Sequence, residues 1–244
     1  LGLQLQLVPR QRFTPVRALY RNGADTLVGD TVFEGGARSL AAAARLGDGR
    51  IVVLGGVAGR AEDGGQALDT VLLFDPQGGY FDLARDANGL PVRMTSPRAA
   101  ATATTLPDGR VLVAGGFASL ASGSPALRSV ELLQVGANGR LESLALEPMA
   151  SARGSATASL RADGAVALVG GLDRFGDAAS ALASAELFVP ASRRFVACAP
   201  LLSPRSGHAA VLMPDGIKLL LVGGSDGEAL RSTELVGPDG VGGC

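Results

Sequence analysis

The sequence predicts an all-β protein built from four copies of one antiparallel unit, and two observations lead to this prediction. An arginine stands ten residues before an Asp-Gly pair four times, and a Gly-Gly pair follows each Asp-Gly at a nearly constant distance. An almost wholly apolar run of four residues precedes each Gly-Gly pair. Repeats of about 50 residues with apolar runs of strand length favour stacked β-sheets. We divide the chain into a partial unit over 1–37 and repeats over 38–97, 98–152, 153–204 and 205–244.

The first strand of each unit consists of small residues, as expected where neighbouring sheets come closest. These strands are expected at 41–44, 99–105, 155–159 and 208–211. The Asp-Gly pair that follows predicts a two-residue hairpin of type I′, which needs positive φ at both central residues. In the fourth copy the Gly-Gly pair begins one residue later than in the others, which predicts a β-bulge in its second strand.

The second strand of each unit is apolar on both faces, which is typical of a strand buried between two layers. The second strands are expected at 51–54, 111–114, 166–169 and 219–222. The third strands are expected at 70–74, 129–133, 184–189 and 232–236, and fourth strands at 80–83, 140–144 and 194–198. The fourth copy lacks a clear fourth strand, whereas 16–20 and 26–33 read as the outer strands of a preceding unit. Such sheets, repeated at this period and buried on both faces, stack radially into a β-propeller.

The composition of the chain bounds its function. The 244 residues carry a formal net charge of −1, which gives no electrostatic case for binding nucleic acid. No apolar run approaches the roughly 18 residues of a membrane helix, so no membrane-spanning segment is expected. Lys218 is the only lysine, a bias typical of a GC-rich bacterial genome.

The two cysteines fit neither a zinc site nor a redox pair of the CxxC type. Cys198 and Cys244 could form a disulfide, because the chain can return towards the outer strand of the third unit, or they could be two unrelated thiols. A lone pair of cysteines indicates an oxidising, extracytoplasmic location: the periplasm, the cell surface or the medium.

The repeat resembles that of the kelch family. Gly-Gly pairs close the second strand in all four copies, and Glu131, Glu186 and Glu234 match the acid of the third strand, where the first copy has Leu72. The family's tryptophan is missing, and Phe81 and Phe195 are its nearest substitutes. The stretch from 107 to 116 looks most like bacterial kelch proteins. The resemblance implies a single propeller domain, either part of a longer ring of six or seven blades or closed by its own N-terminal strands.

The resemblance to kelch proteins also implies a role in binding or scaffolding a protein or ligand. Two classes of enzyme also have kelch propellers. The first, galactose oxidase, needs two histidines, two tyrosines and a cysteine around copper. The chain has one histidine, His208, and two tyrosines, Tyr20 and Tyr80, both in outer-strand regions. The second class, the sialic acid mutarotases, uses no metal. The alternative to a binding or scaffolding role is therefore a carbohydrate-active propeller, which binds a sugar or isomerises it as these enzymes do. We therefore expect no cofactor and no enzymatic activity.

Recognition is expected at the loops after the Gly-Gly pairs, because variable loops on a rigid frame carry function. These loops, 57–69, 117–128, 172–183 and 225–231, contain Arg60, Asp173, Arg174 and Asp226. Acidic clusters at 62–63 and 226–228 lack the spacing of a calcium loop and read as solvated. The glycine-rich stretches are followed by no helix and are not phosphate loops.

The sharpest functional hypothesis concerns the arginine that begins each repeat. Arg38, Arg98, Arg153 and Arg205 would stand at one height around the channel mouth and bind an anionic group, such as an acidic peptide or an acidic sugar. In the alternative, each arginine binds backbone carbonyls of the next unit and serves only to lock the ring.

Overall fold

The computed structural model describes residues 38–58, 65–77 and 80–238, and this part of the chain is all-β. It contains three four-stranded antiparallel sheets, one three-stranded sheet and a two-stranded ribbon. The helical content of these residues is a single 3₁₀ turn, η2 (Ala178–Ser180). Within the same residues, no helix is long and apolar enough to cross a membrane. The predicted all-β class is confirmed.

Each sheet holds the strands of one repeat. The first sheet contains β1 (Ala42–Arg45), β2 (Ile51–Leu54), β5 (Val71–Asp75) and β6 (Tyr80–Leu83). The second contains β7 (Thr102–Thr105), β8 (Val111–Ala114), β9 (Val130–Val135) and β10 (Leu141–Leu146). The third contains β11 (Thr157–Leu160), β12 (Val166–Val169), β13 (Ala185–Val189) and β14 (Arg194–Ala197). The fourth contains β15 (Ala209–Leu212), β16 (Leu219–Val222) and β17 (Thr233–Val236), and the ribbon is β3 (Val57–Ala58) with β4 (Gln66–Ala67).

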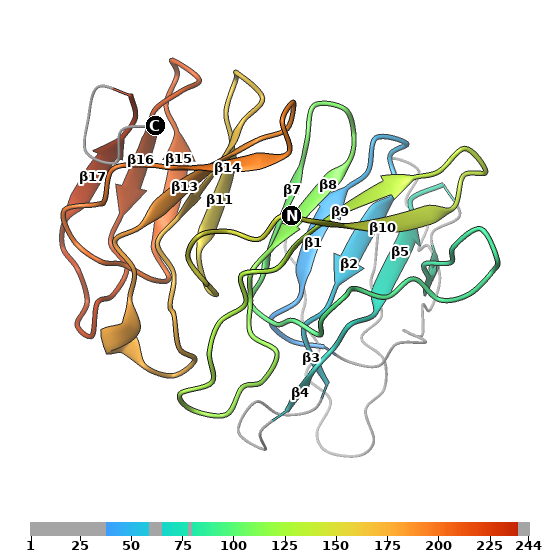
Figure 1. Cartoon of the computed structure of the whole chain (residues 1–244), viewed down its shortest axis with the longest axis horizontal. Coiled ribbons are helices and arrows are strands. Elements are labelled where there is room, and N and C mark those ends of the chain that lie inside the picture. Colours follow the sequence, from blue (N-terminus) through green and yellow to red (C-terminus); the bar gives the residue numbers. More distant parts are fainter. Residues whose placement is uncertain (1–37, 59–64, 78–79, 239–244) are drawn as a thin grey trace, which may run out of the picture.

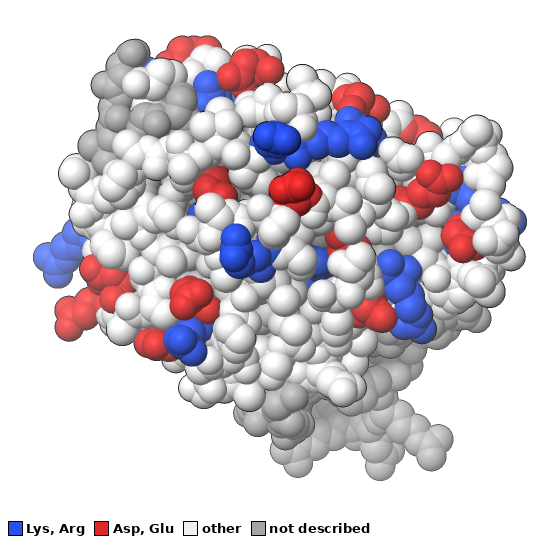
Figure 2. Space-filling view, viewed as in Figure 1, with Lys and Arg blue, Asp and Glu red and all other residues white. Residues whose placement is uncertain are grey.

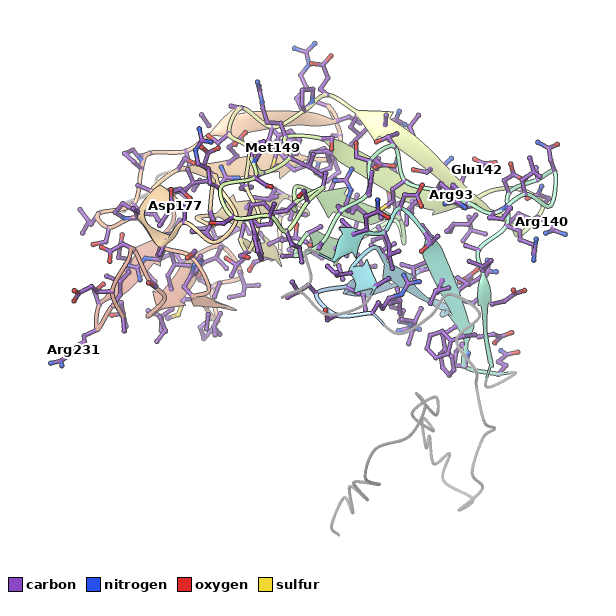
Figure 3. The ribbon with its side chains drawn as sticks, turned by 90° about the horizontal axis from the view of Figure 1, so that it is seen from below. Arg93, Arg140, Glu142, Met149, Asp177 and Arg231 are labelled. Carbon is purple, nitrogen blue, oxygen red and sulfur yellow. The ribbon has the colours of Figure 1, made fainter. Side chains whose placement is uncertain are left out.

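The four sheets follow one another in sequence order, from blue at the first to red at the fourth (Figure 1). The edge strands β1, β7, β11 and β15 are neighbours in space. A separate apolar core fills each junction: one between the first and second sheets, one between the second and third, and one between the third and fourth. Seen from below, the ribbon is curved, with Arg231 and Arg140 towards its opposite ends (Figure 3). The fold is therefore a row of face-packed sheets.

The second strands lie at the predicted bounds in all four repeats. β8 and β12 are buried along their whole length, because each is covered by a neighbouring sheet on both faces. The first strands begin one to three residues later than expected. The cause is a residue in the left-handed region two positions after each repeat's arginine: Leu40, Ala100, Ser155 and Gly207, with φ of 54°, 51°, 52° and 60°.

The predicted type I′ hairpin is wrong. In the first repeat the glycine of the pair, Gly49, has a φ of 93°, and Asp48 is not among the residues with positive φ. Leu46 N–H donates to Arg50 C=O (2.8 Å) and Gly49 N–H donates to Leu46 C=O (3.0 Å), so the loop has three residues and a glycine bulge. An aspartate that binds the backbone N–H two residues later stabilises this turn without needing positive φ itself.

The predicted bulge in the second strand of the fourth repeat is also wrong. β15 and β16 pair without interruption, from Ala209 opposite Val222 to Leu212 opposite Leu219. The closing bond runs from Met213 N–H to Lys218 C=O (2.7 Å), so the extra residue lengthens the turn. A turn absorbs an insertion more easily than a strand whose register is fixed by a buried face and by pairing on both edges.

Candidate functional site

The arginines that begin the second, third and fourth repeats share one buried arrangement, which we call the arginine clasp. In the third sheet, Arg153 Nη1 donates to the carbonyls of Gly170 (2.7 Å) and Ser184 (3.0 Å). Its Nη2 donates to Ser184 Oγ (3.1 Å) and Glu186 Oε1 (2.9 Å). The side chains of Arg153 and Glu186 are only 1% and 2% exposed. Each clasp thus joins the Gly-Gly pair to the third strand of the same sheet.

The other two clasps repeat these bonds. Arg98 binds the Gly115 and Ser129 carbonyls and pairs with Glu131 at 2.6 Å, with neither side chain exposed. Arg205 binds the Gly223 carbonyl (2.8 Å) and pairs with Glu234. Burial lowers the pKa of Arg98 and of Arg153, and the paired carboxylates oppose that shift.

The glutamate of each clasp also holds the segment that arrives from the preceding sheet. Glu186 accepts from the backbone N–H groups of Ala150 (2.7 Å) and Ser151 (2.9 Å). Glu234 accepts from those of Leu202 (2.8 Å) and Ser203 (3.1 Å), and Glu131 from Thr95 N–H and hydroxyl. Sequence reasoning recognised these glutamates but not their pairing with the arginines. The constant separation of 33 residues in two repeats was the available signal.

The first repeat departs from the clasp. Arg38 is half-buried and donates to Gly55 C=O (3.0 Å) and to Thr70 Oγ1 (3.2 Å), and Leu72 stands in the position of the glutamate. Burial lowers the pKa of Arg38.

Three of the predicted binding residues belong to the buried clasps. Arg98, Arg153 and Arg205 direct their guanidinium groups into their own sheets, so the geometry favours the structural one of the two roles that we weighed. Their partners belong to the same unit, whereas the locking alternative placed them in the next. Asp173 and Arg174 form an exposed pair at 4.0 Å, and Asp226 is exposed in the last described loop. Arg60 lies outside the described residues.

The loops after the Gly-Gly pairs interlock from sheet to sheet. The loop of the second sheet pairs with that of the third, through Gly123 N–H to Phe175 C=O (2.8 Å) and Phe175 N–H to Ser124 C=O (2.8 Å). The rings of Phe117 and Phe175 meet edge to face at 5.3 Å, and Phe117 is fully buried. The expected recognition face is therefore a packed layer rather than a set of independent loops.

The strands β1, β7, β11 and β15 form what we call the inner wall. Each is an edge strand that pairs with one partner in its own sheet. The left-handed residues link them, because Ala100 N–H donates to Leu40 C=O (2.9 Å), Ser155 N–H to Ala100 C=O (2.9 Å) and Gly207 N–H to Ser155 C=O (3.4 Å). The remaining unpaired edges present backbone donors and acceptors along the wall.

The inner wall carries hydroxyl side chains. Thr105 Oγ1 donates to Arg45 C=O of the first sheet (2.7 Å). Side chains alternate along a strand, so Thr104 faces the third sheet, and Ser159 likewise faces the fourth. Both are half-buried, and neither hydroxyl has a hydrogen-bond partner among the described residues.

His208 closes the wall between the third and fourth sheets. Its Nε2 lies 2.9 Å from Thr157 Oγ1, and its Nδ1 is buried without a partner in the described part of the chain. Burial lowers the pKa of His208, and the positive charge of Arg205 lowers it further. The negative charge of Glu234 acts in the opposite direction but is outweighed, so the pKa of His208 is about 4. The imidazole is therefore neutral at pH 7.

The face drawn in Figure 2 carries charges of both signs, and the described residues form no metal site. On the face drawn in Figure 2, acidic and basic side chains are interspersed among uncharged ones. Among residues 38–58, 65–77 and 80–238, no group of three or more His, Cys, Asp or Glu side chains could hold a metal ion. Tyr20 and the 62–63 cluster lie outside the described residues, as do the strands predicted at 16–20 and 26–33.

No protein-family model and no curated protein matches the chain. Among solved structures, it is similar to a fungal alcohol oxidase of the AA5 family in complex with copper, with 17% sequence identity and a TM-score of 0.53. The match covers 80% of this chain and 50% of that chain, so the chain spans about half the length of the oxidase. At this identity the match shows a shared fold.

This comparison corrects one expectation. The sequence led us to expect a protein without enzymatic activity, but the solved structure with which the chain shares its fold belongs to an enzyme. The expectation rested on the lack of a recognisable catalytic set and on the binding role that the kelch resemblance implies. Because an oxidase has the same fold, the fold itself does not argue against enzymatic activity. The described residues do not fit the oxidase's copper, because His208 has no second histidine beside it and no cluster of ligands surrounds it.

Proposed function

We propose that the chain is a kelch-type β-propeller domain over residues 1–244 that binds a carbohydrate along its inner wall. The repeats begin at the four arginines, and each forms one blade. Four face-packed sheets in chain order, with their first strands adjacent, support the propeller arrangement.

The observation that carries the proposed ligand is a pair of hydroxyls on the inner wall that have no hydrogen-bond partner in the described part of the chain. Thr104 and Ser159 lie on consecutive blades beside strand edges with unpaired backbone groups. A sugar offers many hydroxyls that both donate and accept, and therefore fits a wall that does the same. The shared fold with an alcohol oxidase supports this choice, because a sugar is a polyalcohol.

The proposal includes a catalytic form, a metal-free isomerisation similar to that of the sialic acid mutarotases. His208 would accept the proton in this step; the residue is 6% exposed, and its pKa of about 4 makes it a weak base at pH 7. We also propose an extracytoplasmic location, which fits both a glycan ligand and a disulfide between Cys198 and Cys244.

A glycan array followed by a turnover assay tests the proposed function. We expect a defined subset of glycans to bind, and a sialic acid or related sugar to interconvert between anomers faster with protein than without it. Binding without turnover would leave a sugar-binding propeller. A chain that binds no sugar on the array, in the folded state verified by circular dichroism, would overturn the proposal.

Recognition of a protein through the loop layer is a second candidate. The interlocked loops of the second and third sheets, with Phe117 buried beneath them, offer a rigid surface that includes Asp173 and Arg174. A pull-down tests this candidate. The wild-type chain should recover a protein partner, and the variants Asp173→Ala and Arg174→Ala should not.

A further inference from the structure

A cavity of about 290 Å³ lies at the outer side of the junction between the first and second sheets. The end of β5 and the outer strand β6 line it from the first sheet, and the turn between β9 and β10 lines it from the second. Its volume is at the lower end of the range for small-molecule sites, which is about 300–1,000 Å³. A ligand of the size of a monosaccharide therefore fits this cavity better than a longer chain does.

Three arginines meet at the turn between β9 and β10, and all three line the cavity. Arg50 Nη2 donates to Gly139 C=O (2.8 Å), so this side chain reaches from the first sheet to the turn. Leu141 N–H donates to Arg85 C=O (3.2 Å), which brings the backbone of Arg85 next to that of Arg140. Guanidinium groups from two sheets are thus gathered around one turn.

Two of these three arginines have no carboxylate partner among the described residues. Arg50 pairs with Asp48 at 2.7 Å, so its charge is neutralised within the protein. Arg85 donates to the Gly89 carbonyl (3.1 Å), and neither Arg85 nor the exposed Arg140 forms an ion pair in the described part of the chain. A guanidinium presents a fork of donors that matches a carboxylate. Arg85 and Arg140 can therefore bind the carboxylate of a ligand.

The strands of the first sheet contribute hydrogen-bond acceptors to the same cavity. Asp75 and Asp82 lie on one face of this sheet, because Asp82 pairs with Leu73, two residues before Asp75. Leu73 packs against the core between the first and second sheets, so this face is turned towards the second sheet. An ionised carboxylate only accepts hydrogen bonds, so it binds the hydroxyls of a ligand and repels an anionic group. The arginines and the aspartates thus suit two different groups of one ligand.

The fold itself does not require these charged residues. The pairing registers place Leu144 and Val196 where the first sheet has Asp82. By the same registers, Glu147 in the second sheet stands where the first sheet has Arg85. The second and third sheets therefore form without the charges that line the cavity. A few converging polar groups around a cavity, confined to one junction, indicate a binding site.

From these observations we infer that the cavity binds a sugar acid, that is, a monosaccharide that bears a carboxylate. The guanidinium groups of Arg85 and Arg140 bind the carboxylate, and Asp75 and Asp82 accept hydrogen bonds from the hydroxyls of the sugar. The cavity shares no residue with the inner wall. The inference therefore goes beyond the proposed function, and either can fail without the other.

Isothermal titration with D-glucuronate and D-galacturonate tests this inference, with D-glucose and inorganic phosphate as comparison ligands. We expect at least one of the two sugar acids to bind the wild-type chain at least tenfold more tightly than either comparison ligand. Glucose lacks the carboxylate, and phosphate lacks the sugar hydroxyls. Added salt should weaken the binding, because Arg85 and Arg140 are exposed and their charges are screened.

Replacement of both arginines, by Arg85→Ala and Arg140→Ala together, should weaken binding of the sugar acid at least tenfold. Arg194→Ala is the matched control and should bind as the wild type does. Arg194 is also an exposed arginine at the beginning of an outer strand, β14, but it lies outside the cavity.

Four results would overturn the inference. The first is a wild-type chain that binds neither sugar acid, and the second is phosphate bound as tightly as the sugar acids. The third is an affinity that is unchanged in the double arginine variant, with its fold verified by circular dichroism. The fourth is sugar-acid binding that Thr104→Val with Ser159→Ala abolishes and the double arginine variant retains, because this would place the sugar acid on the inner wall.

Discussion

Replacement of Arg153 by methionine should be strongly destabilising. The change removes four hydrogen bonds and leaves Glu186, which is 2% exposed, as a buried carboxylate without its cation. Breaking a buried ion pair by removal of one partner costs about 3–5 kcal/mol, largely because the other charge stays buried. We expect a loss of this size in the free energy of unfolding measured with urea.

The matched control is Arg110→Met. Arg110 pairs with Asp108 at 2.6 Å in an exposed turn, where such a pair contributes at most about 1 kcal/mol. The reasoning is refuted if Arg153→Met loses no more stability than Arg110→Met. The same pair of variants separates the two roles of the arginines, because a binding role would leave stability unchanged and abolish binding of an acidic ligand.

Three further predictions follow from the junctions, the buried histidine and the cysteines. Gly115→Ala should destabilise the fold far more than Gly223→Ala in thermal unfolding, since both glycines have similar positive φ but only the first faces the carbonyl of a following arginine, and equal losses would contradict the junction geometry. Because the pKa of His208 is lowered from 6.5 to about 4, the unfolded chain takes up a proton first as the pH falls. Stability should therefore decline from about pH 6.5 towards pH 4 by at most about 3 kcal/mol, and His208→Ala should remove this decline from urea unfolding curves. Thiol titration of the unfolded, unreduced chain should detect no free cysteine, and two titrated thiols would exclude the bond between Cys198 and Cys244.

The sequence predicted best the second strand of each repeat. The strands β2, β8, β12 and β16 were located to the residue because each is a four-residue apolar run bounded by a turn and a Gly-Gly pair, and β8 and β12 are in addition buried on both faces. The beginnings of the first strands were misplaced, because nothing in Leu40, Ala100 or Ser155 signals the left-handed backbone that their neighbours impose. The hairpin type was misjudged because the pattern of an Asp-Gly pair fits two loop lengths, and the hydrogen bonds of Asp48 favour the longer one.

The candidate site was less accessible to sequence reasoning. The arginines were identified as repeated, but their partners lie about 30 residues away on a different strand, so their burial depends on how the sheet closes. The hydroxyls of Thr104 and Ser159 carry no pattern of their own. They stand out only because the inner wall brings β7 and β11 together and leaves these two groups without hydrogen-bond partners among the described residues.

The affinity of a sugar identified on the array for a Thr104→Val/Ser159→Ala double variant tests the central claim most directly. Two lost hydrogen bonds contribute about 1–3 kcal/mol together, so isothermal titration should show binding at least about fivefold weaker than in the wild type. Ser192→Ala, an exposed hydroxyl on the turn before β14, should bind as the wild type does. An affinity unchanged in the folded double variant would contradict a carbohydrate site on the inner wall.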